Sequence, residues 1–196
     1  ELLRKGGYPE DYLELRHACP RCHDTGFVEG KPCACFQELV RQYALRELNA
    51  VSNMELCGFD TFSLGYYSDQ RDPASGVVPR ENMARILDFC KRYAEIFTPK
   101  SKGIFFSGPT GLGKTHLSLA IAKEVIEKGY NVAYGSASDF LRAIEDEHFG
   151  RRQEMDTLDS LLEADLLVLD DLGVEFSSPF NLSAIYNLIN TRGNRQ

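Results

Sequence analysis

The sequence predicts an α/β protein in which helices flank a parallel sheet, preceded by a small module that carries cysteines. From residue 101 onward, short apolar segments of strand length alternate with helical patterns, as in chains that form parallel sheets. Residues 166–170 form an apolar run that ends in acids, which is typical of a central parallel strand. Four of the six cysteines cluster within residues 19–35, so a separate metal-binding module is expected ahead of the sheet.

The first half of the chain is predicted to hold two regions. Residues 1–50 combine the cysteine cluster with a helix over 36–48, where apolar residues recur at helical spacing. Residues 51–100 form a connecting region. It contains an aromatic-rich segment, 59–67, and a second amphipathic helix over 82–97.

Residues 101–196 are predicted to form the α/β core. Strands are expected at 103–107, 131–134 and 166–170, and helices at 114–128, 138–149 and 181–192, with a further short helix before the third strand. Gly129 suits the position after a helix C-terminus, and Ser138 is the expected N-cap of the helix that it begins.

A phosphate-binding loop follows the first predicted strand of this core. Gly108-Pro-Thr-Gly-Leu-Gly-Lys114-Thr115 matches the pattern G-x-x-x-x-G-K-[ST] in full. Its glycines allow successive backbone N–H groups to turn toward phosphate oxygens, and the helix N-terminus adds partial positive charge. The pattern therefore predicts ATP bound with Mg²⁺: Lys114 on the β- and γ-phosphates and Thr115 as a Mg²⁺ ligand. The predicted nucleotide-binding residues are Gly108, Pro109, Thr110, Gly111, Leu112, Gly113, Lys114, Thr115, His116 and Asp170.

Acidic residues end the third predicted strand. We assign Asp170 to Mg²⁺ through water, and Asp171, with Lys114, to catalysis, because a second carboxylate there polarises the attacking water. Glu175 is interpreted either as a sensor of the γ-phosphate or as a solvated loop acid. His116 is expected to be a first-turn helix residue rather than a catalytic one.

The cysteine cluster reads C-x₂-C-x₁₀-C-x-C and predicts structural zinc. Zn²⁺ prefers four tetrahedral thiolate or imidazole ligands, which Cys19, Cys22, Cys33 and Cys35 supply. Gly26 and Gly30 allow the intervening chain to return as a tight hairpin. The alternatives are reduced thiols without metal and, less favoured, an iron–sulfur cluster.

Other candidate residues have two readings each. His17 and His23 are reserve zinc ligands or, as we favour, surface residues. Phe59 and Phe62 either lie near an adenine or, as we favour, pack in the core. The isolated cysteines, Cys57 and Cys90, are expected to be small buried apolar groups.

Composition limits the classes of partner. The net charge of −7 argues against a surface built for tight nonspecific binding to nucleic acid. No apolar run is long enough to span a bilayer, and the N-terminus has neither Met nor a signal-type stretch. We therefore expect a cytoplasmic protein without a membrane partner, and a chain that is a fragment.

Taken together, these motifs resemble the bacterial helicase-loader family of AAA+ ATPases, which includes the DnaC and DnaI proteins and their transposition relative IstB. The resemblance covers nearly the whole chain and includes Cys-Pro-Arg-Cys-His-Asp-Thr-Gly, Phe-Ser-Leu-Gly-Tyr-Tyr-Ser-Asp, the phosphate loop and Leu-Leu-Val-Leu-Asp-Asp-Leu-Gly-Val-Glu. It implies ATP-regulated delivery of the replicative DNA helicase onto single-stranded DNA, with self-assembly through the AAA+ domain. It also implies that Arg142, Arg151 and Arg152 lie where this family faces DNA, although a solvated helix face is the favoured reading.

Two departures from the family pattern bear on these expectations. In AAA+ proteins, the strand between the phosphate-loop strand and the Asp-Asp strand comes later in sequence than Gln196. The ATPase core is therefore expected to be incomplete at its C-terminus, with a gap in the sheet. The family's helicase-binding region precedes the zinc module, and few residues precede Cys19 here.

Several functions remain as alternatives at this point. The leading hypothesis is a helicase-loading ATPase whose hydrolysis is weak or stimulated by a partner. An IstB-like transposition helper shares the same chemistry, although the zinc module counts against it. A nucleotide-gated adaptor with little hydrolysis belongs to a different class, and a small-molecule P-loop kinase is the fourth.

Overall fold

The computed structural model describes residues 2–7, 9, 12, 15–52, 57–150, 157–173 and 178–194. The chain divides into two compact units, Glu1–Gln42 and Tyr43–Gln196. The boundary falls inside helix α2, Ala34–Ser52, which is longer at both ends than the helix that apolar spacing predicts.

The first unit contains the expected hairpin. After the short helix α1, Leu2–Lys5, strands β1, Phe27–Val28, and β2, Lys31–Pro32, pair antiparallel. Glu29 and Gly30 connect them with φ of 51° and 75°, and two positive φ values in a two-residue loop match the right-handed twist of a hairpin. The prediction of a tight return between the cysteine pairs is therefore confirmed.

In the second unit, helix α3, Pro79–Ile96, packs on helix α4, Lys114–Glu127. Proline occupies the first turn of α3, where its missing N–H costs no hydrogen bond, so the helix begins three residues before the predicted start at residue 82. A short 3₁₀ helix, η1, Leu64–Tyr66, precedes α3. The helices bury a common apolar core that comprises Met83, Leu87, Cys90, Ala94, Phe97, Leu117, Ile121 and Val125.

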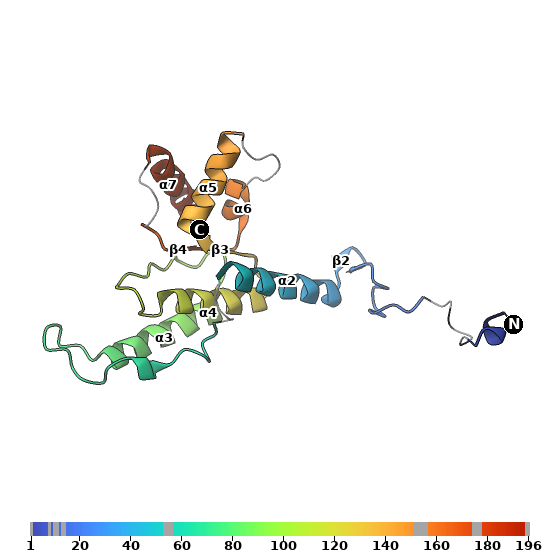
Figure 1. Ribbon diagram of the computed structural model, residues 1–196, viewed down its shortest axis with the longest axis horizontal. Helices are drawn as coiled ribbons and strands as arrows, with labels where there is room; N and C mark the ends of the chain where they lie inside the picture. Colours follow the sequence, from blue (N-terminus) through green and yellow to red (C-terminus); the bar gives the residue numbers. More distant parts are fainter. Residues whose placement is uncertain are drawn as a thin grey trace. The chain divides into compact units, whose positions relative to one another are not determined.

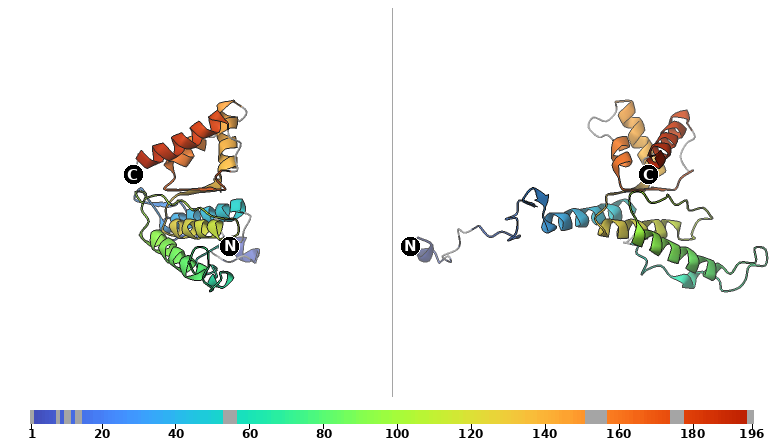
Figure 2. Two further views of the ribbon diagram at one scale, coloured as in Figure 1. Left: turned by 90° about the vertical axis from the view of Figure 1, so that its left-hand side faces the viewer. Right: turned by 180° about the vertical axis from the view of Figure 1, so that it is seen from behind.

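A parallel pair of strands, β3, Val132–Ser136, and β4, Leu166–Asp170, lies between two helical layers. Helices α5, Ala137–His148, α6, Thr157–Glu163, and α7, Pro179–Asn194, lie on one face, and α4 lies on the other with α3 beyond it (Figures 1 and 2). The predicted α/β class with parallel strands flanked by helices is confirmed.

Side chains alternate between the two faces of β3 and β4, as the two-residue period of a strand requires. Leu119, Ala122 and Ile126 of α4 contact one set, which comprises Val132, Tyr134, Leu166 and Val168. Ile144, Leu161 and Leu188 of the opposite helices contact the other set, which comprises Ala133, Leu167 and Leu169. This register places Tyr134 on the α4 face.

The prediction of a strand at residues 103–107 is wrong. Among the described residues, only β3 and β4 pair in this sheet, and 103–107 join no ladder. A cavity of about 400 Å³ lies between this segment and β4, and Phe105 is 79% exposed. A strand needs a neighbour for its N–H and C=O groups, and apolar composition alone supplies none.

One of the two predicted helix-end residues is confirmed and the other is wrong. Gly129 has φ of 88° and donates to Ile126 O at 2.8 Å, so the predicted C-terminal glycine of α4 is confirmed. The cap predicted at Ser138 is wrong. Ser136 caps α5 by accepting a hydrogen bond from Asp139 N at 3.2 Å, because the helix already begins at Ala137.

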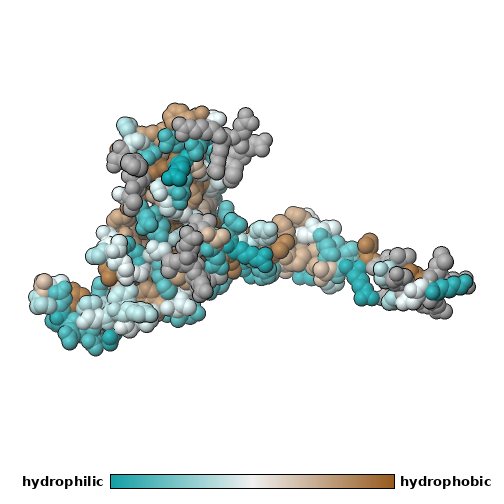
Figure 3. Space-filling model, in the orientation of Figure 1, coloured by the Kyte–Doolittle hydropathy of each residue, from teal (hydrophilic) through white to brown (hydrophobic). Residues whose placement is uncertain are grey.

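No helix within the described ranges is both long enough and apolar enough to cross a membrane. On the face shown in Figure 3, hydrophilic and hydrophobic residues are interspersed. This mixture agrees with a chain in which 26% of the residues are charged.

Candidate functional site

The glycine-rich loop adopts backbone conformations that require glycine. Gly108, Gly111 and Gly113 have φ of 146°, 79° and 81°, a region that other residues enter at a cost. A Cβ on Gly113 would also lie 2.8 Å from the ring of Phe62. The loop therefore needs glycine at residue 113 for two reasons, namely its φ and the close approach of Phe62.

Lys114 begins helix α4 and folds back over this loop. Its ammonium group donates to Gly108 O at 3.0 Å and to Pro109 O at 2.8 Å. A long, flexible cation is thereby held at the turn, next to the first backbone N–H groups of α4, which have no partner within the helix. Anion-binding capacity and a positive charge coincide at this point.

Thr115 and Asp170 bring the two predicted motifs together. The Thr115 hydroxyl donates to Asp170 Oδ1 at 3.3 Å, although the two residues are 55 positions apart. Asp170 stands at the carboxyl end of β4 and Thr115 in the first turn of α4. A hydroxyl and a carboxylate in contact are hard oxygen donors of the kind that Mg²⁺ takes, so the residues present fit the implied cation.

Asp171 follows in an uncommon backbone conformation. Its φ is 51°, its side chain is exposed, and its N–H donates to Asp170 Oδ1 at 3.0 Å. A non-glycine residue at positive φ costs on the order of 1 kcal/mol or more, and such strain is concentrated at functional sites. The bend separates Asp171 from the regular strand that carries Asp170.

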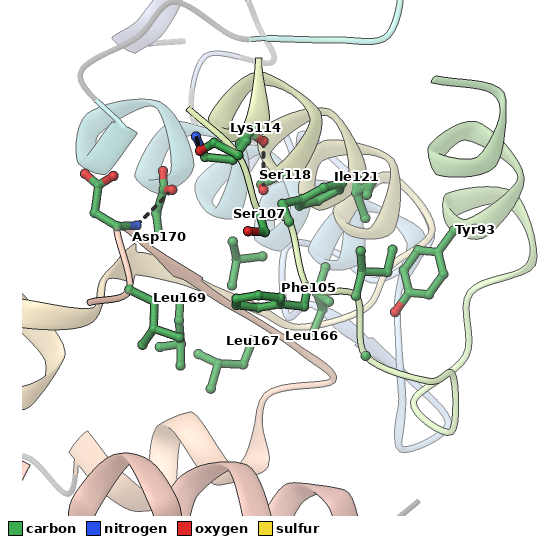
Figure 4. A pocket seen from close by; sticks show the side chains of 17 residues that line it. Tyr93, Phe105, Ser107, Lys114, Ser118, Ile121, Leu166, Leu167, Leu169 and Asp170 are labelled. Atoms are coloured by element: carbon green, nitrogen blue, oxygen red, sulfur yellow. Dashed lines mark hydrogen bonds between the residues drawn. The ribbon is translucent and has the colours of Figure 1, made fainter. Parts of the chain in front are cut away.

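The cavity beside β4 is lined by Lys114, Asp170 and Asp171. Its walls come from residues 103–108, from α4, and from β4 with Asp171 and Leu172 after it. Figure 4 shows Phe105 and the leucines of β4 among the residues that line this cavity, with Lys114 and Asp170 toward one end and Tyr93 toward the other. Polar groups therefore converge at the end nearest the glycine-rich loop, and the rest of the lining is mostly apolar.

A second cavity, of about 210 Å³, lies between the same loop and residues 61–67. Tyr67 donates its hydroxyl to Leu112 O at 3.2 Å, and the edge of Phe62 meets the ring of His116. Both Phe59 and Phe62 pack against the core of α3 and α4, so the core-packing reading holds for both. Only Phe62 also lines this cavity.

His116 connects α4 to the preceding aromatic segment. Its Nε2 lies 2.9 Å from Gly58 O and 3.2 Å from Thr61 Oγ1. These contacts explain how a residue in the first turn of α4 holds residues 58–61 beside the loop. Its predicted place among the nucleotide-binding residues stays a prediction.

The sequence reading missed Tyr134. Its hydroxyl donates to Asp170 Oδ2 at 2.7 Å across the two strands. Burial, followed by the hydrogen bond to the Asp170 carboxylate, raises the pKa of Tyr134 well above its ordinary value, so it remains a donor. The contact depends on strand register, which pairs Ser136 with Asp170. No local pattern in the sequence carries that information.

The four clustered cysteines converge as predicted. All four Sγ atoms lie within 4.8 Å of one another, with Cys19 and Cys33 at 3.9 Å and Cys22 and Cys35 at 3.4 Å. A tetrahedral ion with Zn–S bonds of about 2.3 Å separates its sulfurs by roughly 3.8 Å. The donor set therefore fits zinc. His17 and His23 do not belong to this set.

Local hydrogen bonds hold the first cysteine turn in place. The Asp24 carboxylate accepts from Ala18 N at 3.0 Å and from Cys19 N at 2.8 Å, and these bonds lower the pKa of Asp24. The N–H groups of Cys22 and Arg21 lower the pKa of the Cys19 thiol to about 6. A thiolate is the form that binds metal, so the turn favours the ligating state of Cys19, whereas hydrogen bonds with the neighbouring thiols raise the pKa of Cys35 to about 12.

The remaining candidates lie elsewhere. Cys57 and Cys90 are buried, and burial raises the pKa of both thiols, so their reading as small apolar groups is confirmed. Arg142 is exposed on α5. The other predicted positions, Glu175, Arg151 and Arg152, lie outside the described residues.

Comparison with known proteins now decides the family. Residues 89–196, more than half of the chain, match the family described as "IstB-like ATP binding protein". The chain belongs to this family. Its AAA+ fold and its membership of an ATP-binding family therefore follow, and the resemblance to the helicase-loader group is confirmed as a distant relationship.

Three similar proteins show how far the relationship extends. The replicative helicase loader DnaC of Escherichia coli K12 is 31% identical over 114 residues, which cover 57% of this chain and 46% of that protein. The loader DnaI of Bacillus subtilis is 34% identical over 90 residues, 46% of this chain and 28% of that protein. The AMPPCP-bound structure of DnaA from Aquifex aeolicus aligns with a TM-score of 0.48 and 23% identity, covering 72% of this chain and 41% of that one. The chain thus spans about half the length of the DnaC loader and a smaller share of the DnaI loader.

Proposed function

We propose that this chain is an ATP-hydrolysing AAA+ protein that helps to load the replicative DNA helicase onto single-stranded DNA. The observation that carries the ATPase part is the contact between Thr115 and Asp170 beside Lys114. Lys114 and Asp170 line one cavity, and Thr115 joins them through its hydrogen bond to Asp170. The loader part rests on the relatives, two of which are named replicative helicase loaders.

In this proposal the glycine-rich loop and the start of α4 hold the phosphates. The backbone N–H groups of the loop, other than at Pro109, would donate to phosphate oxygens, and the Lys114 ammonium would exchange its contacts with loop carbonyls for the β- and γ-phosphates.

Thr115 and Asp170 would hold Mg²⁺, Asp170 through water. When bound, Mg²⁺ neutralises charge on the phosphate oxygens. Asp171, placed by its bend beyond the strand end, orients and polarises the attacking water.

The second cavity is the proposed site of the nucleobase. Phe62, Tyr66 and Tyr67 line it beside Gly111 and Leu112, and aromatic rings offer a face on which a base can stack. His116 supports it through Gly58 and Thr61. This assignment refines the earlier hypothesis in favour of Phe62 over Phe59.

The cysteine module is proposed to bind one structural zinc ion through Cys19, Cys22, Cys33 and Cys35. Its two-residue strands bury little apolar surface, because both residues of β2 and one residue of β1 are exposed. Metal binding would then supply folding free energy to this unit.

The proposed cycle is a nucleotide-dependent switch. A ligand shifts an equilibrium only through its different affinities for two states, and γ-phosphate contacts of Lys114 and Asp171 would differ between ATP and ADP. That difference would bias binding to the helicase and to single-stranded DNA. The chain is also proposed to self-assemble through its AAA+ core.

The deciding experiment is co-purification of the chain with the host's replicative helicase, with ATP and without nucleotide. We expect capture that differs between the two conditions and that becomes nucleotide-independent in Lys114→Ala. Failure to capture the helicase in either condition would refute the loader role. It would favour the IstB-like transposition helper, which the family match also allows, or the nucleotide-gated adaptor.

A further inference from the structure

Tyr134 is the side chain at this site that neither sequence motif includes. It lies in the middle of β3, and its hydroxyl donates to Asp170 Oδ2 at 2.7 Å. The ring belongs to the face that packs on α4, next to the cluster of Leu48, Cys57 and Leu119. A ring held by this packing brings its hydroxyl to one place.

The Asp170 carboxylate is held on both oxygens. Oδ1 accepts from the Thr115 hydroxyl at 3.3 Å and from Asp171 N at 3.0 Å, whereas within the described part of the chain Oδ2 accepts from Tyr134 alone. Rotation of the carboxylate would break contacts at both ends. Without Tyr134, Oδ2 would lose the donor that fixes the plane of the group.

We infer that Tyr134 is a positioning residue that orients Asp170 toward the Mg²⁺ proposed at Thr115. This inference rests on the proposed function. Donors that orient the groups around a metal ion tune its affinity, and their removal typically costs 10–100-fold. Tyr134 touches no nucleotide in this scheme and acts only through Asp170.

The test compares Tyr134→Phe with the wild-type chain, because phenylalanine keeps the packed ring and removes only the hydroxyl. Binding of a fluorescent ATP analogue is measured as Mg²⁺ is titrated, and again in EDTA. We expect the Mg²⁺ midpoint to rise about tenfold or more, with nucleotide affinity in EDTA unchanged. Tyr130→Phe is the matched control. It removes a tyrosine hydroxyl just before β3, where the ring packs on Phe97, and should leave the midpoint in place.

A second measurement uses the chain without nucleotide or metal. The loss of stability caused by Tyr134→Phe is measured by urea unfolding in the wild-type chain and in Asp170→Ala. A loss that occurs only in the wild-type background shows that the hydroxyl acts through Asp170. The inference would be overturned, with the proposed function intact, if Tyr134→Phe lost the same stability in both backgrounds. It would also be overturned if the Mg²⁺ midpoint of Tyr134→Phe equalled that of a wild-type chain that responds to Mg²⁺. If the nucleotide affinity of the wild-type chain does not change with Mg²⁺, both the proposed function and this inference are overturned.

Discussion

Gly113→Ala tests the glycine-rich loop most directly, because the structure separates two costs at this residue. Its φ of 81° is in the left-handed region, where a Cβ costs about 1–2 kcal/mol. The same Cβ would lie 2.8 Å from Phe62 Cε2 and 3.0 Å from the Tyr67 hydroxyl. Displacing packed neighbours adds about 1–3 kcal/mol, so the expected loss is roughly 2–5 kcal/mol in all.

Gly111→Ala is the matched control in the same loop. Its φ is 79°, but a Cβ there meets nothing within 4 Å, so only the backbone cost of about 1–2 kcal/mol applies. Urea unfolding of both variants measures the difference, which isolates the contact with Phe62. If Gly113→Ala loses no more stability than Gly111→Ala, the packing of Phe62 against the loop does not exist in solution.

Three further outcomes test the site and the module. Lys114→Ala should abolish ATP binding, measured by calorimetry, and undiminished affinity would remove the phosphate-binding role. Asp171→Asn should retain ATP affinity but slow phosphate release in a steady-state assay by about 10²-fold or more; unchanged turnover would exclude Asp171 as the group that polarises water. Elemental analysis of protein purified without chelators should find about one zinc per chain, reduced by Cys19→Ser and not by Cys57→Ser. Less than about a tenth of an equivalent would exclude a zinc site.

Local sequence was sufficient where the physical cause is local. Helix α4 was predicted within one residue of its observed end, because the glycine at 129 reverses the backbone where it stands. The strand 166–170 was predicted with its observed bounds, since an apolar run between acids suits a buried strand. The convergence of the four cysteines likewise follows from short spacings and a two-residue turn.

The sequence predictions were wrong where the local structure depends on hydrogen bonds to another segment or residue. Residues 103–107 have strand-like composition but no partner for their backbone groups in the described chain, so they form no ladder. Ser136 and Ser138 are both candidate caps for α5. Ser136 is the cap because β3 ends at that residue and α5 begins at the next one. Hydrogen-bond partners, not composition, settle both cases.

By itself, the sequence determined the chemistry of this protein: a loop that can hold phosphates, acids at a strand end and four thiols at metal-binding spacing. Only the tertiary structure decided that Thr115 meets Asp170 and that Tyr134 holds the other carboxylate oxygen. The physical reason is that spacing along the chain governs contacts within a turn. Contacts between strands depend on register and packing, which form only when distant segments fold together.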